Sequence, residues 1–337
     1  MRHPIDLASA LLLRWGPERM KFFTDGWGDE SLLTPPDIER LPADPIPVEW
    51  LSTEARGGYE LRHGTFMSPA PGLPDRAVRG SVVAVLPESI DRMVLLMPAW
   101  NEHEPTVRLG LAEILARRGF GSLLLESAFF GSRHPHAIDE PRVHPIRTVS
   151  DFMVMGVSAV IEARGLLAWL AAEGHRIGVS GYSMGANTAA LVAGSYPEPM
   201  AVAALAASYS PSPVFTEGIL RHGVSWDALG GEEAAEDRLA EVLLGANALA
   251  LPAKPHLSAA VVVGARTDAY IPAHATEDLA NHWKSDLRWH PGGHATLVWR
   301  RMDLLADAVE DAYSRFEALG AHPRESAEGD GGQRLES

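Results

Sequence analysis

The sequence has 337 residues, 46% of them hydrophobic, and a formal net charge of −15 from 44 acidic and 29 basic side chains. This length and composition predict one large globular domain or two smaller ones. The acidic balance argues against binding to nucleic acid or to an anionic membrane through bulk charge. The lack of cysteine excludes disulfides, thiolate catalysis and cysteine-based zinc sites.

Residues 1–47 are expected to form an N-terminal extension that packs on the core. Residues 5–15 have the spacing of a short amphipathic helix, and the aromatic and glycine-rich stretch at 22–28 favours a docked turn. Residues 34–47 are rich in proline and are expected to cross the surface. Asp6 and the lack of a small-residue cleavage site argue against a signal peptide, and the apolar runs do not favour a transmembrane helix, so we expect a cytoplasmic protein.

The main domain is predicted to span residues 48–319. It begins with three strand-like runs and then alternates strands with helices, which is typical of an α/β fold. The predicted strands are 48–53, 59–67, 81–86, 92–97, 122–126, 177–180, 200–208, 258–265 and 286–290, and the predicted helices are 104–118, 146–173, 184–196 and 297–319. We therefore predict a mostly parallel central sheet with antiparallel N-terminal strands and helices on both faces.

Two segments depart from this alternation. Residues 210–255 are first proline-rich and then acidic and helical, and their place between two core strands suggests a cap or lid over a pocket. A surface insertion without a binding role is the alternative. Residues 320–337 contain almost no apolar side chains and are expected to be disordered.

The longest apolar window, 153–172, is interrupted by Glu162 and Arg164 and is expected to be a buried helix.

A serine motif stands at the centre of the predicted domain. Residues 181–185, Gly-Tyr-Ser-Met-Gly, fit the G-x-S-x-G nucleophile elbow between a β-favouring run and an alanine-rich helix. A serine at such a sharp turn leaves no room for side chains two positions away on either side, which explains the glycines. The N–H groups of the following helix favour an oxyanion. An ordinary glycine-rich turn carrying a solvated serine is the alternative.

An acyl-transfer site also needs a base and an orienting acid, here in the chain order serine, acid, histidine. Asp268 follows the predicted strand 258–265, and His294 lies in a glycine-rich loop after the predicted strand 286–290. Either residue alone could be a turn or helix-start residue. Together and in this order, they predict a triad of Ser183, Asp268 and His294.

The remaining parts of such a site are an oxyanion hole and an acyl pocket. The backbone N–H of Met184 is one expected oxyanion donor, and Ala99 or Trp100, after strand 92–97, is the candidate for the second, although the usual His-Gly pair is absent there. Four aromatic residues are candidates for an apolar pocket, although each is also a candidate core residue. They are Phe129, Phe130, Phe215 and Trp226.

We expect no metal and no organic cofactor. The run His134-Pro135-His136-Ala137-Ile138-Asp139 is similar to a metallo-hydrolase motif, but the aspartate is one position late and no histidine follows it, so a chance grouping is the better interpretation. No glycine-rich nucleotide motif is present.

Several longer segments match a known family. They are residues 21–28, 123–135, 183–185, 214–220, 268–272 and 292–294. Over residues 22–316 the chain resembles the alpha/beta hydrolase domain-containing protein 18 family, within the alpha/beta-hydrolase superfamily. The resemblance implies an alpha/beta-hydrolase fold and a Ser-Asp-His hydrolase at Ser183, Asp268 and His294, and it suggests a lipid acyl ester such as a phospholipid as substrate. The sequence departs from the superfamily pattern at Ala186 and in the glycine-free loop 98–101.

These observations lead to one hypothesis with two kinds of alternative. The hypothesis is a serine hydrolase that cleaves a carboxylic ester, of a small molecule or a lipid, through an acyl-enzyme on Ser183. A thioesterase, amidase or acyltransferase would use the same three residues. A non-catalytic binding or scaffold protein on the same fold is the alternative from another class. We expect neither nucleic-acid binding nor stable membrane insertion, and the oligomeric state stays open.

Overall fold

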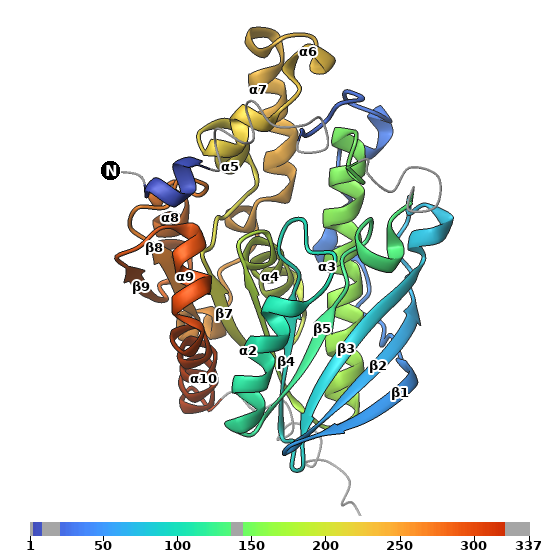
Figure 1. Ribbon diagram of the computed structural model, residues 1–337, viewed down its shortest axis with the longest axis vertical. Helices are drawn as coiled ribbons and strands as arrows, with labels where there is room; N and C mark the ends of the chain where they lie inside the picture. The colour runs from blue at the N-terminus through green and yellow to red at the C-terminus, as the bar shows by residue number, and fades with distance from the viewer. Residues whose placement is uncertain (1–2, 9–20, 136–143, 321–337) are drawn as a thin grey trace, which may run out of the picture.

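A nine-stranded sheet forms the centre of the protein in the computed structural model, which describes residues 3–8, 21–135 and 144–320 (Figure 1). The strands are β1 Glu49–Arg56, β2 Tyr59–Met67, β3 Arg79–Pro87, β4 Arg92–Met97, β5 Phe120–Leu125, β6 Arg176–Tyr182, β7 Ala201–Leu205, β8 Val261–Ala265 and β9 Asp286–His290. Their order is β1-β2-β3-β5-β4-β6-β7-β8-β9. The pairs from β1 to β5 in this order are antiparallel and all later pairs are parallel, which confirms the predicted mixed sheet.

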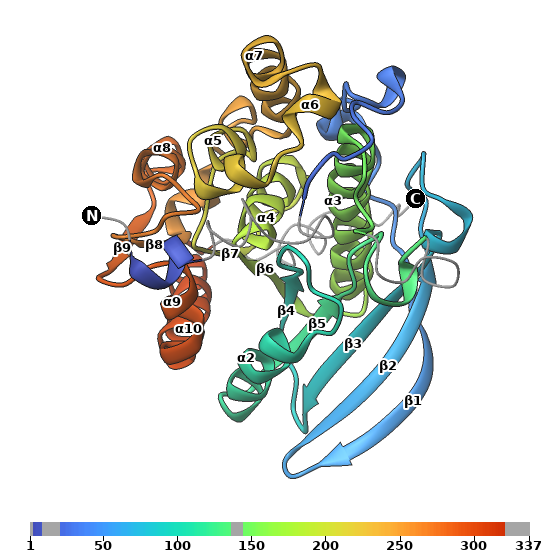
Figure 2. The same cartoon turned by 45° about the horizontal axis from the view of Figure 1, so that its top comes forward.

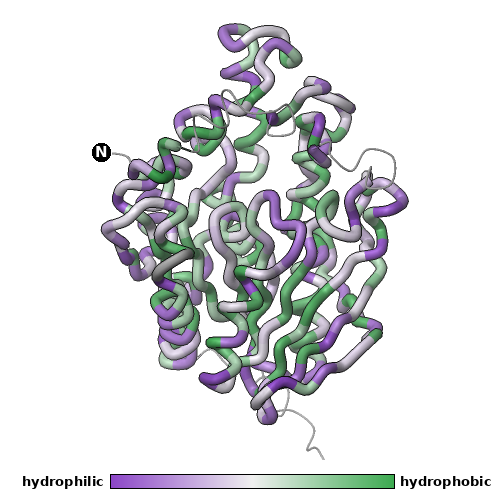
Figure 3. The backbone as a smooth tube through the Cα atoms, in the orientation of Figure 1, coloured by the Kyte–Doolittle hydropathy of each residue, from purple (hydrophilic) through white to green (hydrophobic). Residues whose placement is uncertain are grey.

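Helices cover both faces of the sheet, as Figure 2 shows. One face carries α2 Thr106–Arg117, α9 His294–Arg300 and α10 Met302–Ala318, and the other carries α3 Val149–Ala172, α4 Met184–Ser195 and α8 Ala273–Trp283. Successive residues of a strand point to opposite faces, so Leu95 joins the core under α3 and α4 while Leu96 joins the core under α2 and α10. Figure 3 shows that the central strands consist largely of hydrophobic residues.

Helix α3 is the long apolar helix that the sequence predicts. Thr148 and Asp151 form a capping box at its start, which satisfies two backbone N–H groups that the helix itself leaves free. Within the described residues it is the one helix long and apolar enough to cross a membrane, but 78% of its apolar window is buried inside the protein. Its Glu162 forms a fully buried ion pair with Arg133. These contacts make α3 a core helix of the fold.

The insertion between β7 and β8 lies beyond the carboxyl ends of the parallel strands (Figures 1 and 2). It contains α5 Ser212–Thr216, α6 Trp226–Leu229 and α7 Glu232–Leu243. Residues 21–29 pack against it: the Phe22 N–H donates to the Gly223 carbonyl at 2.9 Å, and the Trp27 indole donates to the Leu229 carbonyl at 3.1 Å. The insertion and the N-terminal aromatic stretch therefore share one apolar cluster.

The observed elements differ from the predicted ones in a few places. The predicted helix 297–319 is two helices, because Arg301 leaves the helical conformation at φ −136° and ψ 31°. Helix α8 was not predicted. The first predicted helix is present at residues 4–8, and its later part lies outside the described residues, as do His136, Asp139 and the predicted tail from residue 321.

Candidate active site

Ser183 occupies a strained turn between β6 and α4. Its backbone has φ 58° and ψ −120°, a conformation that non-glycine residues adopt only where the surrounding structure imposes it. A Cβ on Gly181 would lie 2.2 Å from the Gly185 carbonyl oxygen, and one on Gly185 would lie 2.5 Å from the Met97 carbonyl oxygen. Both glycines are therefore required by close packing, which confirms the predicted strand–turn–helix geometry.

The structure brings the three predicted residues into one hydrogen-bonded chain. His294 Nε2 lies 3.0 Å from Ser183 Oγ, and His294 Nδ1 lies 2.7 Å from Asp268 Oδ2. The other carboxylate oxygen of Asp268 accepts hydrogen bonds from the N–H groups of Tyr270 at 2.8 Å and Ile271 at 3.0 Å. These bonds fix the carboxylate, so Nδ1 carries its proton toward Asp268 and Nε2 is left to accept the serine proton.

The electrostatic surroundings of His294 favour its protonated form. Burial lowers the pKa of the imidazole, but the charge and hydrogen bond of Asp268, together with the charge of Asp6, outweigh this effect and raise the pKa above its usual 6.5. A raised pKa strengthens the imidazole as a proton acceptor. The pair is well shielded, because the side chains of His294 and Asp268 are only 11% and 4% exposed.

Two tyrosines that the sequence analysis did not single out frame the histidine. The Tyr182 hydroxyl donates to the His294 carbonyl oxygen, and burial, with the charges of Asp268 and Asp6, raises the pKa of that hydroxyl well above 10, so it remains a donor. The Tyr270 ring stacks on the imidazole with a centroid distance of 4.8 Å. Tyr182 occupies the first variable position of the serine motif, and this position was the one feature of the sequence that could have indicated its place beside the site.

The backbone N–H groups predicted as oxyanion donors differ in their hydrogen bonds. The N–H groups of Met184 and Trp100 have no hydrogen-bond partner within the described ranges. The N–H of Ala99 instead points toward Glu102 Oε2 at 3.5 Å, and Arg108 holds that carboxylate. The Ala99 N–H is thus directed to a carboxylate, which favours Trp100 over Ala99 as the predicted second donor.

A narrow cavity of about 50 Å³ opens beside the nucleophile, and we refer to it as the Ser183 cavity. Its lining includes Trp100, Phe152, Met184, Phe215, Leu220 and Ile271. A second cavity of about 40 Å³, the α3–α4 cavity, shares Phe152, Met184, Asn187 and Pro211 with the first. Because these four residues line both, the two cavities lie next to each other, and we refer to them together as the apolar slot.

Of the four aromatic residues predicted for an acyl pocket, Phe215 lines the Ser183 cavity and the other three do not. Phe129 and Phe130 are 1% and 0% exposed and belong to the apolar cluster around the cavity rather than to its lining. The Trp226 indole donates to the Arg221 carbonyl, and its ring lies under the Arg221 guanidinium. Phe152, from the first turns of α3, takes the place that these residues were expected to fill.

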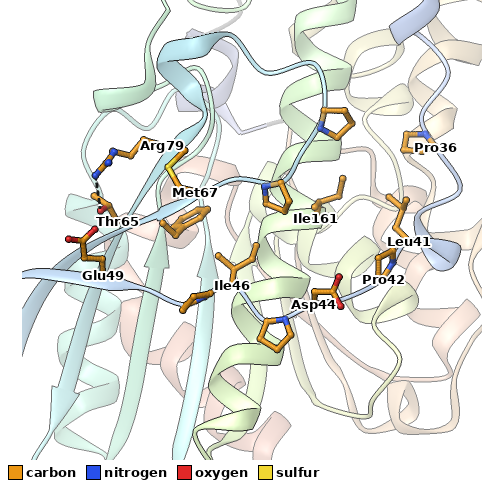
Figure 4. A pocket seen from close by; sticks show the side chains of 15 residues that line it. Pro36, Leu41, Pro42, Asp44, Ile46, Glu49, Thr65, Met67, Arg79 and Ile161 are labelled. Atoms are coloured by element: carbon orange, nitrogen blue, oxygen red, sulfur yellow. Dashed lines mark hydrogen bonds between the residues drawn. The ribbon is translucent and has the colours of Figure 1, made fainter.

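A larger groove of about 570 Å³ lies between the proline-rich segment, β2 and α3 (Figure 4). Its lining is mostly apolar and includes Pro42, Ile46, Phe66, Met67 and Ile161. None of the triad residues lines it. Size alone therefore does not identify the reactive site, since acyl-transfer chemistry needs a nucleophile and a base.

The described residues contain no group of three or more His, Asp or Glu side chains arranged to hold a metal ion. His134, the first residue of the histidine run, is 5% exposed.

The order of the strands, the serine elbow at the carboxyl end of β6 and the placement of the acid and histidine after β8 and β9 define an α/β-hydrolase fold. The structure is similar to an acylaminoacyl peptidase from Pyrococcus horikoshii (TM-score 0.52, 12% identity, covering 78% of this chain and 42% of that one). It is also similar to a glucuronoyl esterase from Teredinibacter turnerae (TM-score 0.51, 14% identity, covering 82% and 80%). A protein from Thermus thermophilus matches with TM-score 0.50 and 18% identity, covering 81% and 98%.

The sequence places the chain more specifically within this fold. The model of the family described as alpha/beta hydrolase domain containing 18 matches residues 20–256 and 232–315. The chain belongs to this family, as the resemblance of its sequence segments predicted.

Proposed function

We propose that the protein is a serine hydrolase that cleaves a carboxylic ester through an acyl-enzyme on Ser183. The observation that carries the proposal is the unbroken hydrogen-bonded chain from Ser183 Oγ through His294 to Asp268, with distances of 3.0 and 2.7 Å. The strained backbone of Ser183 adds support, because strain of this kind is concentrated at reactive sites.

In the proposed reaction, Ser183 Oγ attacks the ester carbonyl carbon while His294 Nε2 takes the hydroxyl proton. Asp268 stabilises the resulting imidazolium through the Nδ1 hydrogen bond. The N–H groups of Met184 and Trp100 donate to the oxyanion of the tetrahedral intermediate. When the ester C–O bond breaks, His294 gives its proton to the leaving alkoxide. A water molecule, deprotonated by His294, then attacks the acyl-enzyme and releases the acid and free Ser183.

The shape of the cavities supports an apolar acyl group as the part of the substrate bound beside Ser183. The Ser183 cavity is narrow and mainly apolar, and the neighbouring α3–α4 cavity adds Met153, Met155 and Leu191 to the lining. In this proposal the acyl chain extends from the first cavity into the second. Methionine side chains adapt to irregular ligands because they are unbranched and flexible. An unbranched acyl chain, as in a lipid ester, fits this slot better than a bulky or charged group.

The test is reaction of the purified protein with a fluorophosphonate probe, followed by mass spectrometry of the labelled peptide. We expect label on Ser183, loss of label in Ser183→Ala and slower labelling in His294→Ala. Ser195→Ala is a matched control, since Ser195 is a buried serine of the same helix that only donates to a backbone carbonyl. Folded protein that does not react, or that reacts equally in Ser183→Ala, would contradict the proposal.

A further inference from the structure

A short N-terminal segment reaches the candidate active site from far away in the sequence. The helical turn at residues 4–8 lies beside α9 in both ribbon views (Figures 1 and 2). This turn buries a charged side chain and exposes apolar ones, which is the reverse of the usual pattern. Asp6 is 0% exposed, whereas its neighbours Ile5 and Leu7 are each 42% exposed. The segment therefore docks through a buried carboxylate and not through its apolar side chains.

The N–H groups that donate to this carboxylate belong to the two loops that carry Asp268 and His294. Asp6 Oδ2 accepts hydrogen bonds from the N–H groups of Ala269 at 3.2 Å and His294 at 2.8 Å. Asp6 Oδ1 accepts a third from Ala295 at 3.3 Å. Ala269 directly follows Asp268, so one side chain joins the backbone next to the acid with the backbone of the base.

The backbone of these loops also packs closely against the N-terminal segment. The His3 N–H donates to the Thr267 carbonyl at 2.8 Å. A Cβ on Gly293 would lie 2.4 Å from His3 Cβ and 2.5 Å from Asp6 Oδ2, so the glycine before the histidine leaves the space that the segment occupies. The two loops also share a direct backbone bond, from the Thr267 N–H to the Gly292 carbonyl at 3.2 Å.

We infer that Asp6 is a positioning residue of the active site, which holds the Asp268 and His294 loops at the separation that their hydrogen bond requires. The inference rests on the proposed function for its catalytic consequence, but its structural part stands without it. Misplacing catalytic groups by about an ångström can slow a reaction by roughly a hundredfold. The negative charge of Asp6 also contributes to the raised pKa of His294, beside Asp268 and against the effect of burial.

The decisive variant is Asp6→Asn, which keeps the shape but puts an NH₂ group among three N–H donors. Asp37→Asn is the matched control, because Asp37 is an exposed aspartate that pairs only with Arg40. Hydrogen exchange measured by mass spectrometry would follow the peptides covering 265–271 and 291–297, with α10 as an internal reference. Fluorophosphonate labelling rates from pH 5 to 9 would be measured on the same samples.

We expect both loop peptides to exchange faster in Asp6→Asn while α10 is unchanged, and labelling to slow by roughly ten- to a hundredfold. We also expect the acid limb of the labelling rate to move to lower pH, because the loss of a nearby negative charge lowers the pKa of the imidazole. A purely structural role would slow labelling without moving this limb. Asp37→Asn should match the wild type in every measurement.

Unchanged exchange in both loops, or unchanged labelling despite faster exchange, would overturn the inference. Should Asp6→Asn not fold, Gly293→Ala displaces the segment while keeping the carboxylate, and the same two peptides should loosen. If the wild type itself does not label but the loops still loosen in Asp6→Asn, the proposed hydrolase mechanism fails while Asp6 keeps its role in holding the loops together.

Discussion

The apolar slot beside Ser183 can be shortened at a single position. Gly156 lies on α3 and lines the α3–α4 cavity, and a Cβ built there meets no atom within 4 Å. A leucine at this position should therefore enter the cavity without a backbone clash and close the far part of the slot. Helix propensity also favours the change by about 0.5–1 kcal/mol over glycine, so the variant should fold.

The size of the effect follows from the methylene groups that the slot can bury. Each buried methylene contributes about 0.8 kcal/mol, or roughly a fourfold change in kcat/KM. If Gly156→Leu excludes three methylenes of a long chain, the loss is about 2.4 kcal/mol, which is roughly fiftyfold. We therefore expect the ratio of kcat/KM for p-nitrophenyl decanoate to that for the butyrate to fall by this order, with the butyrate value nearly unchanged.

Two matched variants make this measurement specific. Gly156→Ala adds only the Cβ and should keep most of the chain-length preference. Gly110 lies on α2 and has equally open space, but it does not line either cavity, so Gly110→Leu should leave the ratio at the wild-type value. A decanoate-to-butyrate ratio that is the same in the wild type and in Gly156→Leu would refute the assignment of this slot to the acyl chain.

Two further predictions concern charge. Because His294 must be neutral to take the serine proton and its pKa is raised, kcat/KM should fall as pH decreases through a value above 6.5. Asp268→Asn should lower this value and reduce kcat about ten-thousandfold, whereas an acid limb that does not move would contradict the pairing. Glu162→Gln should lower the free energy of unfolding by about 3–5 kcal/mol in urea titrations, because it leaves the fully buried Arg133 without its partner charge. The double variant Arg133→Met/Glu162→Leu should lose less unfolding free energy than the sum of the losses in the two single variants, and simple additivity would contradict the coupling.

The sequence predicted those features that depend on local signals. Strands β2, β4 and β9 match the predicted residues, because each is a run of β-favouring residues bounded by glycine or polar turns. Ser183, Asp268 and His294 were identified from the glycine spacing, the strand ends and their order along the chain. The turns themselves determine where these side chains are presented, so no long-range information was needed.

Features that depend on tertiary packing were missed or wrongly assigned. Phe129 and Phe130 were recognisably apolar, but a sequence pattern does not show whether an aromatic ring faces a cavity or the core. Phe152 lines the Ser183 cavity because α3 packs against α4, a tertiary contact that the local sequence pattern does not show. Asp6 lies 288 residues before the backbone N–H of His294 that it binds, and no local pattern indicates such a bond.

The central claim is that an acyl group passes through Ser183. The most direct measurement is intact-protein mass spectrometry of samples quenched within milliseconds of mixing with a p-nitrophenyl ester, with the modified peptide then identified by fragmentation. We predict a transient mass increase equal to one acyl group on Ser183, formed together with a stoichiometric burst of p-nitrophenol, and neither signal in Ser183→Ala. Ester hydrolysis that persists in Ser183→Ala, or turnover by the wild type with no adduct on Ser183 under any quench time, would contradict the account.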